Sequence, residues 1–326
     1  MFKKGGCEIT VVDRLRARNV GWDLINKYQY SHFRLHKIFN KCGAQRVHLE
    51  SFISDEEQQN HFFIVKGRAG ATGLLKLNRL DWDTLHFCQP MYRISFIHNE
   101  TNNLAWEGLG ECMLAMLISF LGEGYVDAAV DHDDYLWLNV LFDAGFRLYD
   151  SKNRYVFRAH QRPVDLRAPF LCRDFLPEDM DSVFGILKEI NFAAKFSRDP
   201  FFDGRKEKVK AMYESWVRGL MSRNNCDDPV LVVERNTHVV AFGAGEKLFL
   251  PPAAEGKSVC GNSLFFCSGS AAGSYPALVH HLTTHTRKNF DALELVASIT
   301  NYPAIRVLER LGLQIAAGVH SLAIKL

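Results

Sequence analysis

Two clusters of metal-ligand side chains stand out in the sequence. His280, His281 and His285 fall on one predicted helix, and the histidines at 281 and 285 are four residues apart, on one helix face that would suit a divalent ion. No further ligand, such as the glutamate of an HExxH motif, is correctly placed beside them. The run from Asp131 to Asp134, DHDD, has suitable residue types but forms a polar turn after an apolar strand. The sequence therefore predicts no metal site.

The eight cysteines predict buried, reduced thiols rather than disulfides or a metal site. No two of them form a CxxC pair, and several lie within apolar runs. The first sixteen residues become charged before any apolar stretch long enough for a signal peptide, and no uninterrupted apolar run approaches ~18 residues. These features predict a soluble, cytoplasmic protein that is not a membrane protein.

Length and charge narrow the class of partner. At 326 residues the chain is long enough for two domains, and its 47% hydrophobic content supports buried cores. The 39 Lys and Arg against 37 Asp and Glu leave a net charge of +2, whereas affinity for a phosphate backbone needs concentrated cations. The sequence thus argues against a nucleic-acid partner and favours a small molecule. The oligomeric state stays open between a monomer and a homodimer.

An internal repeat predicts two similar units. Residues 126–148 align without gaps to residues 293–315 at a constant offset of 167, with Tyr135/Tyr302 and Gly145/Gly312 among the identities. Each copy has the pattern of a short strand, a polar turn, a helix, and a glycine where a helix would end in the left-handed conformation.

The remaining elements fit the same scheme. In the second half the sequence predicts helices near 177–190 and 209–220, a hairpin of 230–234 with 239–244, a strand at 262–267, a small-residue loop at 268–274 and a helix at 276–288. The first half offers strands at 61–65, 72–77 and 92–98 and a helix at 104–121. The proline-containing stretch 158–169 is the predicted linker, so we expect units of residues 1–162 and 163–326.

Three segments carry a resemblance to a known superfamily. Residues 301–312, NYPAIRVLERLG, resemble the NxxAIxLYxxxGF signature of the GNAT acyltransferases. Residues 80–93, LDWDTLHFCQPMYR, resemble the L-x-W-[DE]-x-x-F-F-G segment of the branch that acylates nucleotide-linked amino sugars. Residues 191–200, NFAAKFSRDP, followed by 212–217, MYESWV, are similar to the Arg/Asp-Pro loop and YxxW helix of that branch. The resemblance mostly covers residues 80–157 and 171–326.

The resemblance implies an α/β (α+β) fold of two tandem GNAT-like units, each a mixed, mostly antiparallel twisted sheet flanked by helices. It also implies acyl-CoA as co-substrate. The superfamily binds the pyrophosphate of CoA with a loop of the pattern Q/R-x-x-G-x-G/A. At the corresponding positions, 270–275, this sequence has SAAGSY, which lacks the basic residue and the last glycine. The first unit has AWEGLG at 105–110, with Glu100 and Glu107 close by, which disfavours an anion.

We therefore place acyl-CoA in the second unit and expect the first unit to shape the acceptor pocket. Backbone groups of residues 265–268 are the expected contacts to the acyl carbonyl and pantetheine. The residues implied in binding the co-substrate are Phe266, Cys267, Ser268, Ser270, Ala271, Ala272, Gly273, Ser274 and Asn301.

Candidates for proton transfer are few. The superfamily's thiolate-protonating tyrosine is replaced by Leu308, so Tyr302 or Tyr275 is a substitute, unless both pack in the fold and water serves instead. Glu246 and Asp199 are the candidate bases, each with an alternative as a solvated surface carboxylate.

An acceptor that carries a diphosphate needs cations and flat faces. Arginines and aromatic residues of these types near the segments that resemble the acceptor region are Arg198, Arg205, Tyr213 and Trp216, with Trp82, Arg93 and Arg79 in the first unit. The helical spacing of Tyr213 and Trp216 also fits a core position.

These inferences predict an N-acyltransferase that moves an acetyl or 3-hydroxybutyryl group from acyl-CoA to the amine of a TDP-linked amino-deoxy sugar. Two alternatives stay open. One is an acyltransferase for an aminoglycoside, a polyamine or a protein lysine, whose cationic acceptor would favour an acidic cleft. The other is a catalytically inactive GNAT-fold binding module, which the changes at Ser270 and Leu308 would suit.

Overall fold

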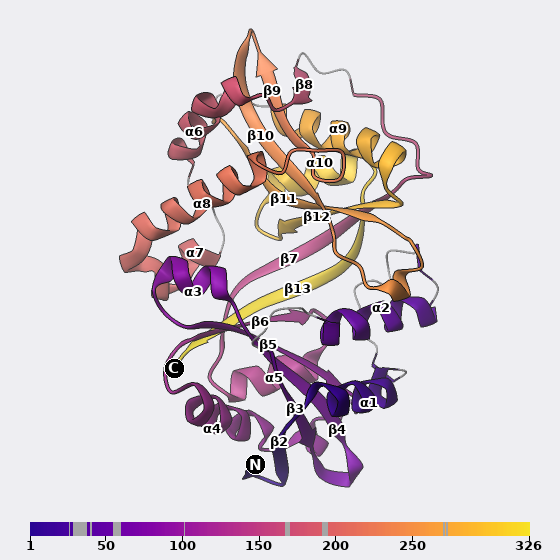
Figure 1. Ribbon diagram of the computed structural model, residues 1–326, viewed down its shortest axis with the longest axis vertical. Coiled ribbons are helices and arrows are strands. Elements are labelled where there is room, and N and C mark those ends of the chain that lie inside the picture. Colours follow the sequence, from indigo (N-terminus) through magenta and orange to yellow (C-terminus); the bar gives the residue numbers. More distant parts are fainter. Residues whose placement is uncertain are drawn as a thin grey trace. The chain divides into compact units, whose positions relative to one another are not determined.

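The computed structural model divides the chain into two units (Figure 1). It describes residues 1–25, 27–28, 38–39, 41–54, 60–100, 102–166, 170–190, 195–269, 271 and 273–326. Unit 1 comprises Met1–Ser151, Pro251–Ala254 and Gly318–Leu326, and unit 2 comprises Lys152–Leu250 and Glu255–Ala317. The chain thus passes between the units after residues 151 and 317, inside two strands, and on either side of residues 251–254, whereas residue 163 in the predicted linker lies within unit 2.

The first half of the chain contains, in order, β1 Phe2–Lys4, β2 Cys7–Val12, α1 Arg14–Ile25, α2 Lys41–Ser54, β3 Asn60–Lys66, η2 Arg68–Gly70, β4 Thr72–Arg79, α3 Asp81–Phe87, β5 Met91–His98, η3 Asn103–Trp106, α4 Leu109–Leu121, β6 Tyr125–Asp131, α5 Tyr135–Asp143 and β7 Arg147–Arg158.

The second half contains, in order, β8 Leu171–Asp174, η4 Pro177–Asp179, α6 Met180–Glu189, α7 Lys195–Arg198, η5 Pro200–Arg205, α8 Lys206–Met221, β9 Val230–Arg235, β10 His238–Lys247, η6 Pro252–Ala254, β11 Val259–Cys267, α9 Ser274–Asn289, β12 Ala292–Ser298, α10 Tyr302–Arg310 and β13 Gln314–Lys325.

Each unit has one mixed sheet. The strand order is β1-β2-β3-β4-β5-β6-β13 in unit 1 and β7-β12-β11-β10-β9-β8 in unit 2. Neighbours pair antiparallel except β5 with β6 and β11 with β12. The last strand of each unit comes from the other half of the chain: residues 319–325 of β13 pair with β6, and residues 152–158 of β7 pair with β12. This exchange sets the unit boundaries, because each swapped strand belongs to the sheet it completes.

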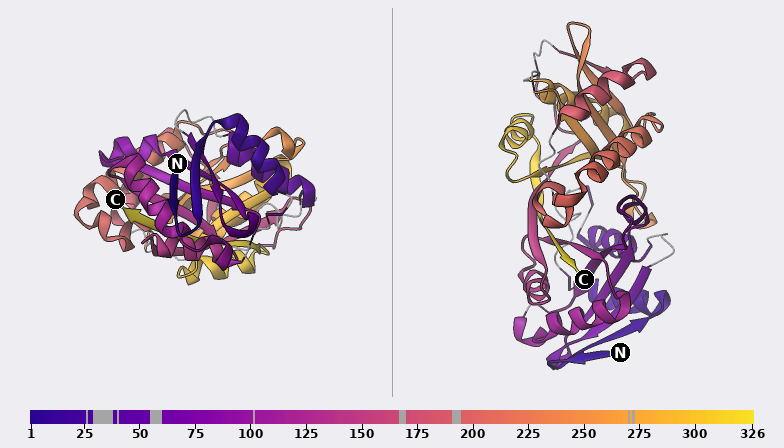
Figure 2. Two further views of the ribbon diagram at one scale, coloured as in Figure 1. Left: turned by 90° about the horizontal axis from the view of Figure 1, so that it is seen from below. Right: turned by 90° about the vertical axis from the view of Figure 1, so that its left-hand side faces the viewer.

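Helices cover both faces of each sheet because the strand residues alternate between two apolar cores. In unit 1, Phe63 and Leu75 join the core under α4 and α5, while Phe62 and Leu74 join the core under α1 and α2. In unit 2, α9 and α10 share a core with strands β7 to β12, and α6 packs on β10. Figure 2 shows α6 and α8 on the opposite side of that sheet from α10.

The predicted repeat is confirmed at the level of hydrogen bonds. The bounds of β6, α5 and β7 recur in β12, α10 and β13 at the offset of 167 residues. Asp134 caps α5 by accepting from the Trp137 amide at 3.0 Å, and Asn301 caps α10 by accepting from the Ala304 amide at 3.3 Å. Gly145 (φ 89°) and Gly312 (φ 84°) end the two helices in the left-handed region.

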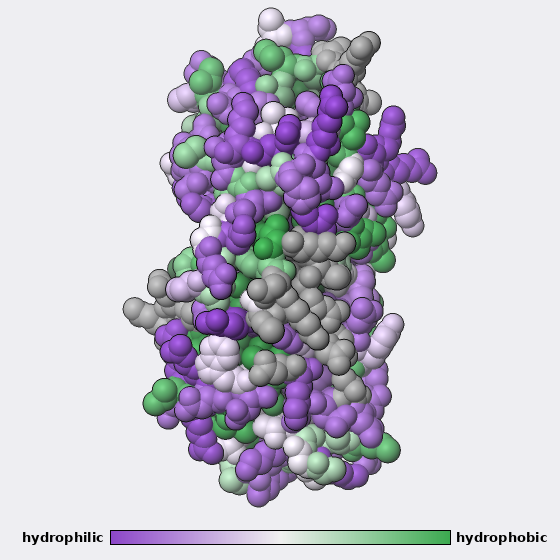
Figure 3. Space-filling model, turned by 90° about the vertical axis from the view of Figure 1, so that its right-hand side faces the viewer, coloured by the Kyte–Doolittle hydropathy of each residue, from purple (hydrophilic) through white to green (hydrophobic). Residues whose placement is uncertain are grey.

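One described segment is long and apolar enough to cross a membrane by length and composition. Asn103–Leu121 has a mean hydropathy of 1.5, and 44% of its window is buried. The inward side chains of its helix α4, such as Met113 and Met116, lie in the core of unit 1. Hydrophilic residues predominate on the described surface that Figure 3 presents, with small hydrophobic patches between them. The segment therefore has the character of a core helix.

Candidate functional site

A β-bulge opens the edge of β11 in unit 2. The register of β10 against β11 passes from Ala244/Leu264 to Gly245/Asn262, which leaves Ser263 as the extra residue. In the described register, β12 pairs with β11 only at residues 259–261, and the Asn262 Oδ1 accepts the Val296 amide at 2.7 Å where the strands diverge. Residues 263–267 therefore lie beyond the described pairing of β11 with β12, where the two parallel strands diverge and form a fork.

The loop after β11 leads to the N-terminus of α9. The Ser268 amide donates to the Val240 carbonyl at 2.8 Å, and the Ser274 hydroxyl donates to the Ala271 carbonyl at 2.8 Å. Gly273, at φ 94°, turns the chain into the helix, whose first turn carries no acidic residue. The first N–H groups of a helix lack intrahelical acceptors and attract anions. The predicted contacts Ser270 and Ala272 lie outside the described residues.

At the fork, the predicted co-substrate residue Phe266 is buried and Cys267 is partly buried, which favours contacts from the backbone. Phe266 stacks on Phe242 with ring centroids 5.0 Å apart, on the opposite sheet face from Cys267. Burial raises the pKa of the Cys267 thiol, which keeps it protonated. Ser274 is fully buried and its hydroxyl is engaged by the loop, so its role in the structure is to hold the turn.

The candidate tyrosines differ in environment. Tyr302 begins α10 and is 65% exposed, next to the capping residue Asn301. Tyr275 packs edge-on against Phe265 at 6.0 Å, and burial raises its pKa, with Cys267 and Tyr155 as close neighbours. Leu308, at the superfamily's tyrosine position, is fully buried in the core.

The two candidate bases are held in different ways. Glu246 follows the bulge on β10, opposite Gly261, and is half-buried with Arg223 at 3.7 Å. Asp199 is buried and caps η5, because its carboxylate accepts from the Phe201 amide at 2.9 Å. Sequence reasoning missed this capping role, although the Asp-Pro pair before a helix is a start signal.

The arginines proposed for the acceptor already have protein partners. Arg198 donates to the Thr300 hydroxyl at 2.6 Å, and Arg205 lies 4.0 Å from the centre of the Phe201 ring. In unit 1, Arg93 makes two hydrogen bonds to Asp127, at 2.8 and 2.9 Å.

The aromatic candidates pack against neighbouring rings. In unit 2, Tyr213 is buried and stacks on the half-buried Trp216, with centroids 6.1 Å apart. In unit 1, Trp82 stacks on His86 at 5.4 Å and stays 46% exposed.

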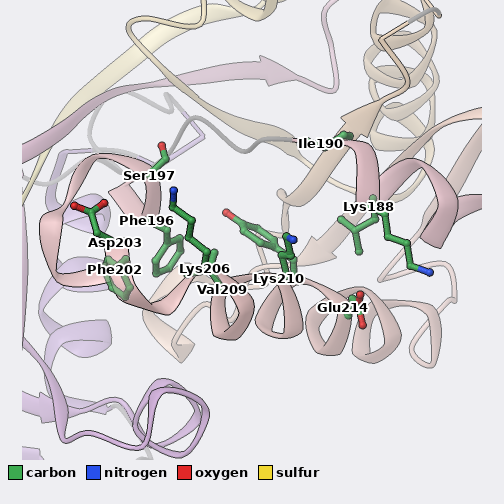
Figure 4. Close-up of a pocket in the computed structure, with 12 residues that line it drawn as sticks. Lys188, Ile190, Phe196, Ser197, Phe202, Asp203, Lys206, Val209, Lys210 and Glu214 are labelled. Carbon is green, nitrogen blue, oxygen red and sulfur yellow. The ribbon is translucent and has the colours of Figure 1, made fainter.

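A pocket of about 460 Å³ lies in unit 2 among α6, α7, η5 and α8 (Figure 4). Of the predicted acceptor residues it contains Tyr213 alone. Its cations are lysines, which sequence reasoning did not single out; Lys206 and Lys210, four apart on α8, were the available signal. Its lining residues are Leu187, Lys188, Ile190, Phe196, Ser197, Phe202, Asp203, Lys206, Val209, Lys210, Tyr213 and Glu214.

In unit 1, β5 and β6 also diverge after a short pairing, at residues 91–94 of β5, but the described strands show no bulge and the helix N-terminus is covered. The pairing of β4 with β5 runs from Gly73/His98 to Arg79/Tyr92 without a register shift. At the N-terminus of α4, the hairpin of β1 and β2 is so close that a Cβ on Gly108 would lie 2.7 Å from the Gly5 Cα. Two carboxylates there are ion-paired, Glu107 with Arg68 and Glu111 with Lys4.

A buried histidine–aspartate pair occupies the end of β5 in unit 1. The His98 Nε2 lies 3.2 Å from an Asp134 carboxylate oxygen, and its Nδ1 lies 2.8 Å from the Glu100 carbonyl. Both ring nitrogens of this buried side chain thus lie within hydrogen-bond distance of oxygen atoms. Asp134 occupies the repeat position of Asn301, so this polar pair replaces the amide cap of unit 2.

No group of three or more metal-ligand side chains occurs within the described ranges. On α9, the His285 Nε2 is 2.9 Å from the Cys226 carbonyl. The Asp131–Asp134 segment belongs to the turn that caps α5.

The fold is similar to that of several solved acetyltransferase structures. A GCN5-related N-acetyltransferase from Sphaerobacter thermophilus matches 99% of this chain and 96% of its own at a TM-score of 0.59 and 13% identity. A tandem GNAT protein from the clavulanic acid biosynthesis pathway matches 98% of each chain at 0.51 and 10% identity. A GCN5-related N-acetyltransferase from Kribbella flavida matches 85% of this chain and 93% of its own at 0.50 and 12% identity.

This chain therefore has the GNAT fold, as the sequence predicts, with mixed sheets flanked by helices. No protein-family model and no curated protein matches its sequence.

Proposed function

We propose that unit 2 transfers an acyl group from acyl-CoA to an amine. The observation that carries this proposal is the fork of β11, with its bulge at Ser263, beside the acid-free N-terminus of α9. A fork supplies backbone N–H groups for an acyl carbonyl, and a helix N-terminus favours a pyrophosphate. Unit 1 has an unshifted β4–β5 ladder and a covered helix N-terminus, which supports one acyl-CoA site for each chain.

The reaction we propose is direct attack on the thioester. The neutral amine adds to the carbonyl carbon, backbone N–H groups stabilise the oxyanion, and the C–S bond breaks as the C–N bond is completed. The thiolate leaves with the electron pair and takes a proton from Tyr275, Tyr302 or water. Glu246 is the better-supported base, because it adjoins the bulge and is half-buried, whereas the Asp199 carboxylate is engaged as a helix cap.

We further propose a TDP-linked amino-deoxy sugar as acceptor, with an acetyl or 3-hydroxybutyryl donor. The segments at 80–93 and 191–217 that resemble the sugar-nucleotide branch support this acceptor. The lysines of the pocket add support, because a cationic acceptor such as an aminoglycoside or polyamine would favour acidic side chains.

A thiol-release screen tests the proposal. Several acyl-CoAs are combined with TDP-amino sugars, aminoglycosides, polyamines and peptides, and free thiol is followed over time. Thiol release with a sugar nucleotide supports the full proposal. Thiol release only with cationic acceptors contradicts the proposal that the acceptor is a sugar nucleotide. No release together with no acetyl-CoA binding by calorimetry identifies the inactive binding module instead.

The base assignment has its own test. Glu246→Gln should lower kcat/KM by about 10²–10⁴-fold and alter its pH profile, the usual contribution of general base catalysis. Glu178→Gln, at an exposed position in η4 of unit 2, is the matched control and should change neither. An unchanged kcat/KM and pH profile in Glu246→Gln would remove Glu246 from the mechanism.

A further inference from the structure

The pocket between α6 and α8 combines an aromatic wall with free positive charge. Its inner surface includes Phe196, Phe202 and the buried Tyr213. Burial raises the pKa of Tyr213 to about 12, so its hydroxyl stays protonated and able to donate. A volume of about 460 Å³ is that of a site for a drug-sized ligand.

The cations of this pocket are available to a ligand. Among the residues that the structure describes, Lys206 has no ion-pair partner. Lys210 pairs with Glu207 at 3.1 Å, but both side chains are exposed, and such pairs contribute little. In Figure 4 the Lys206 amine points up beside Ser197, while the carboxylates of Asp203 and Glu214 lie at opposite ends.

We propose that this pocket binds the nucleoside diphosphate portion of the acceptor, with Lys206 and Lys210 on the phosphates and the Phe196, Phe202 and Tyr213 wall against the flat ring. Two ammonium groups one helical turn apart suit two neighbouring phosphates, and the aromatic wall suits a ring that water solvates poorly. That the ligand is the acceptor rests on the proposed function; the site itself does not.

This assignment replaces the arginines as the expected phosphate ligands. Arg198 and Arg205 are engaged by Thr300 and Phe201 and do not line the pocket. Lysines bind phosphate as mobile point charges, so binding should depend on salt and on the ring as well as on the diphosphate.

Calorimetric titration of TDP into the full chain, without any CoA, tests the site. We expect one TDP for each chain, and binding at least about tenfold weaker in the double variant Lys206→Glu and Lys210→Glu, since each charge-assisted contact is worth about a factor of ten or more. Lys208→Glu is the control: it makes one such charge reversal on α8 but does not line the pocket, and should weaken binding much less than either Lys206→Glu or Lys210→Glu alone. Inorganic pyrophosphate, which lacks the ring, should bind more weakly than TDP.

The outcomes separate this site from the proposed function. Absence of TDP binding, equal loss in Lys208→Glu and the double variant, or equal binding of pyrophosphate and TDP would overturn the site even if thiol release is seen with another acceptor. TDP binding that depends on Lys206 and Lys210 supports the site even if the chain fails to bind acetyl-CoA, in which case only the proposed acyl transfer fails. Unchanged thermal melting of the variants shows that the fold is retained.

Discussion

At the scale of single residues, the same helix cap is built with different chemistry in the two repeats. Asp134 caps α5 and also holds the buried His98, whereas Asn301 caps α10 at an exposed position. Loss of Asp134 should cost more than loss of a cap alone, because it also removes a hydrogen-bond partner of the buried His98 ring.

Asp134→Ala should therefore lower the free energy of unfolding by about 2–4 kcal/mol, the sum of a lost cap and a lost buried hydrogen bond, and Asn301→Ala by about 1 kcal/mol. Asp134→Asn, which keeps an acceptor for the Trp137 amide, should fall between them. Chemical denaturation of the three variants measures these values. Equal, small losses in both alanine variants would contradict a stabilising role for the His98–Asp134 contact.

His48 on α2 predicts an acid-sensitive stability. Burial lowers its pKa from 6.5 to about 4, so in the folded chain it stays neutral. Between pH 6.5 and 4, His48 binds a proton more readily in the unfolded chain than in the folded chain. The contribution of His48 to the free energy of unfolding is therefore complete above pH 6.5 and falls by about 3 kcal/mol as the pH drops to 4. His48→Gln should flatten the fall, while the exposed His238→Gln should leave it unchanged. Chemical denaturation across this pH range measures the effect. An equal slope of unfolding free energy against pH in His48→Gln and the parent chain would contradict this role of His48.

Sequence reasoning found the elements around the proposed site better than the contacts of single side chains. The strand predicted at 262–267 lies within β11, and Gly273 of the predicted small-residue loop precedes α9, while the binding roles of these residues stay predictions. The engagement of Arg198 and Arg205 elsewhere, and the exposure of Lys206 and Lys210, depend on how α7, η5 and α8 pack. The contacts of long side chains depend on this tertiary packing, and a local sequence pattern does not predict it.

At the scale of the elements, the bulge distinguishes the two units. Deleting Ser263 removes the extra residue while the β10–β11 pairs on either side remain compatible with a regular ladder, as in β4 and β5. The backbone groups on one side of the deletion should then shift by one position relative to the fork, and acyl-CoA turnover should fall by at least about 100-fold, as when an oxyanion donor is lost.

Ser263→Ala is the control for that deletion, because it keeps the extra residue and loses only a hydroxyl. It should retain turnover within a few-fold. Steady-state kinetics of both variants, with circular dichroism to verify folding, measures the difference. Full activity in a folded deletion variant would show that the bulge has no part in the reaction.

Most elements follow from the periodicity of the sequence. The hairpin of β9 and β10, the strand β11 and the repeat of strand, helix and strand form as predicted. The prediction did not include the β1–β2 hairpin, α1, α2, α3 or β8. Short strands such as β1 and β8 are defined by their partners, so their residues carry little signal of their own.

At the scale of the whole molecule, the exchange of β7 and β13 makes each unit depend on both halves of the chain. The sequence predicts a boundary near residue 163, whereas residues 152–158 pair in unit 2 and residues 319–325 pair in unit 1. Strand pairing depends on residues far apart in the sequence. The composition of a linker therefore does not predict which strands pair.

Removing Gly318–Leu326 should therefore destabilise unit 1, although these residues end the second half of the chain. The backbone amides of β6 lose their partner strand and should exchange with deuterium at least about tenfold faster. Those of β12, which keeps β7, serve as the internal control. Hydrogen exchange by mass spectrometry makes the comparison. Faster exchange in β12 alone would contradict the exchanged arrangement.

We expect each chain to bind one acyl-CoA, in unit 2. Calorimetric titration with acetyl-CoA should give one site, at least about tenfold weaker in Gly269→Asp, which adds a negative charge in open space in the loop before α9. Gly185→Asp, also in open space but on α6, should bind as the parent chain does. Two sites for each chain, no binding at all, or equal affinities in both variants would contradict the claim.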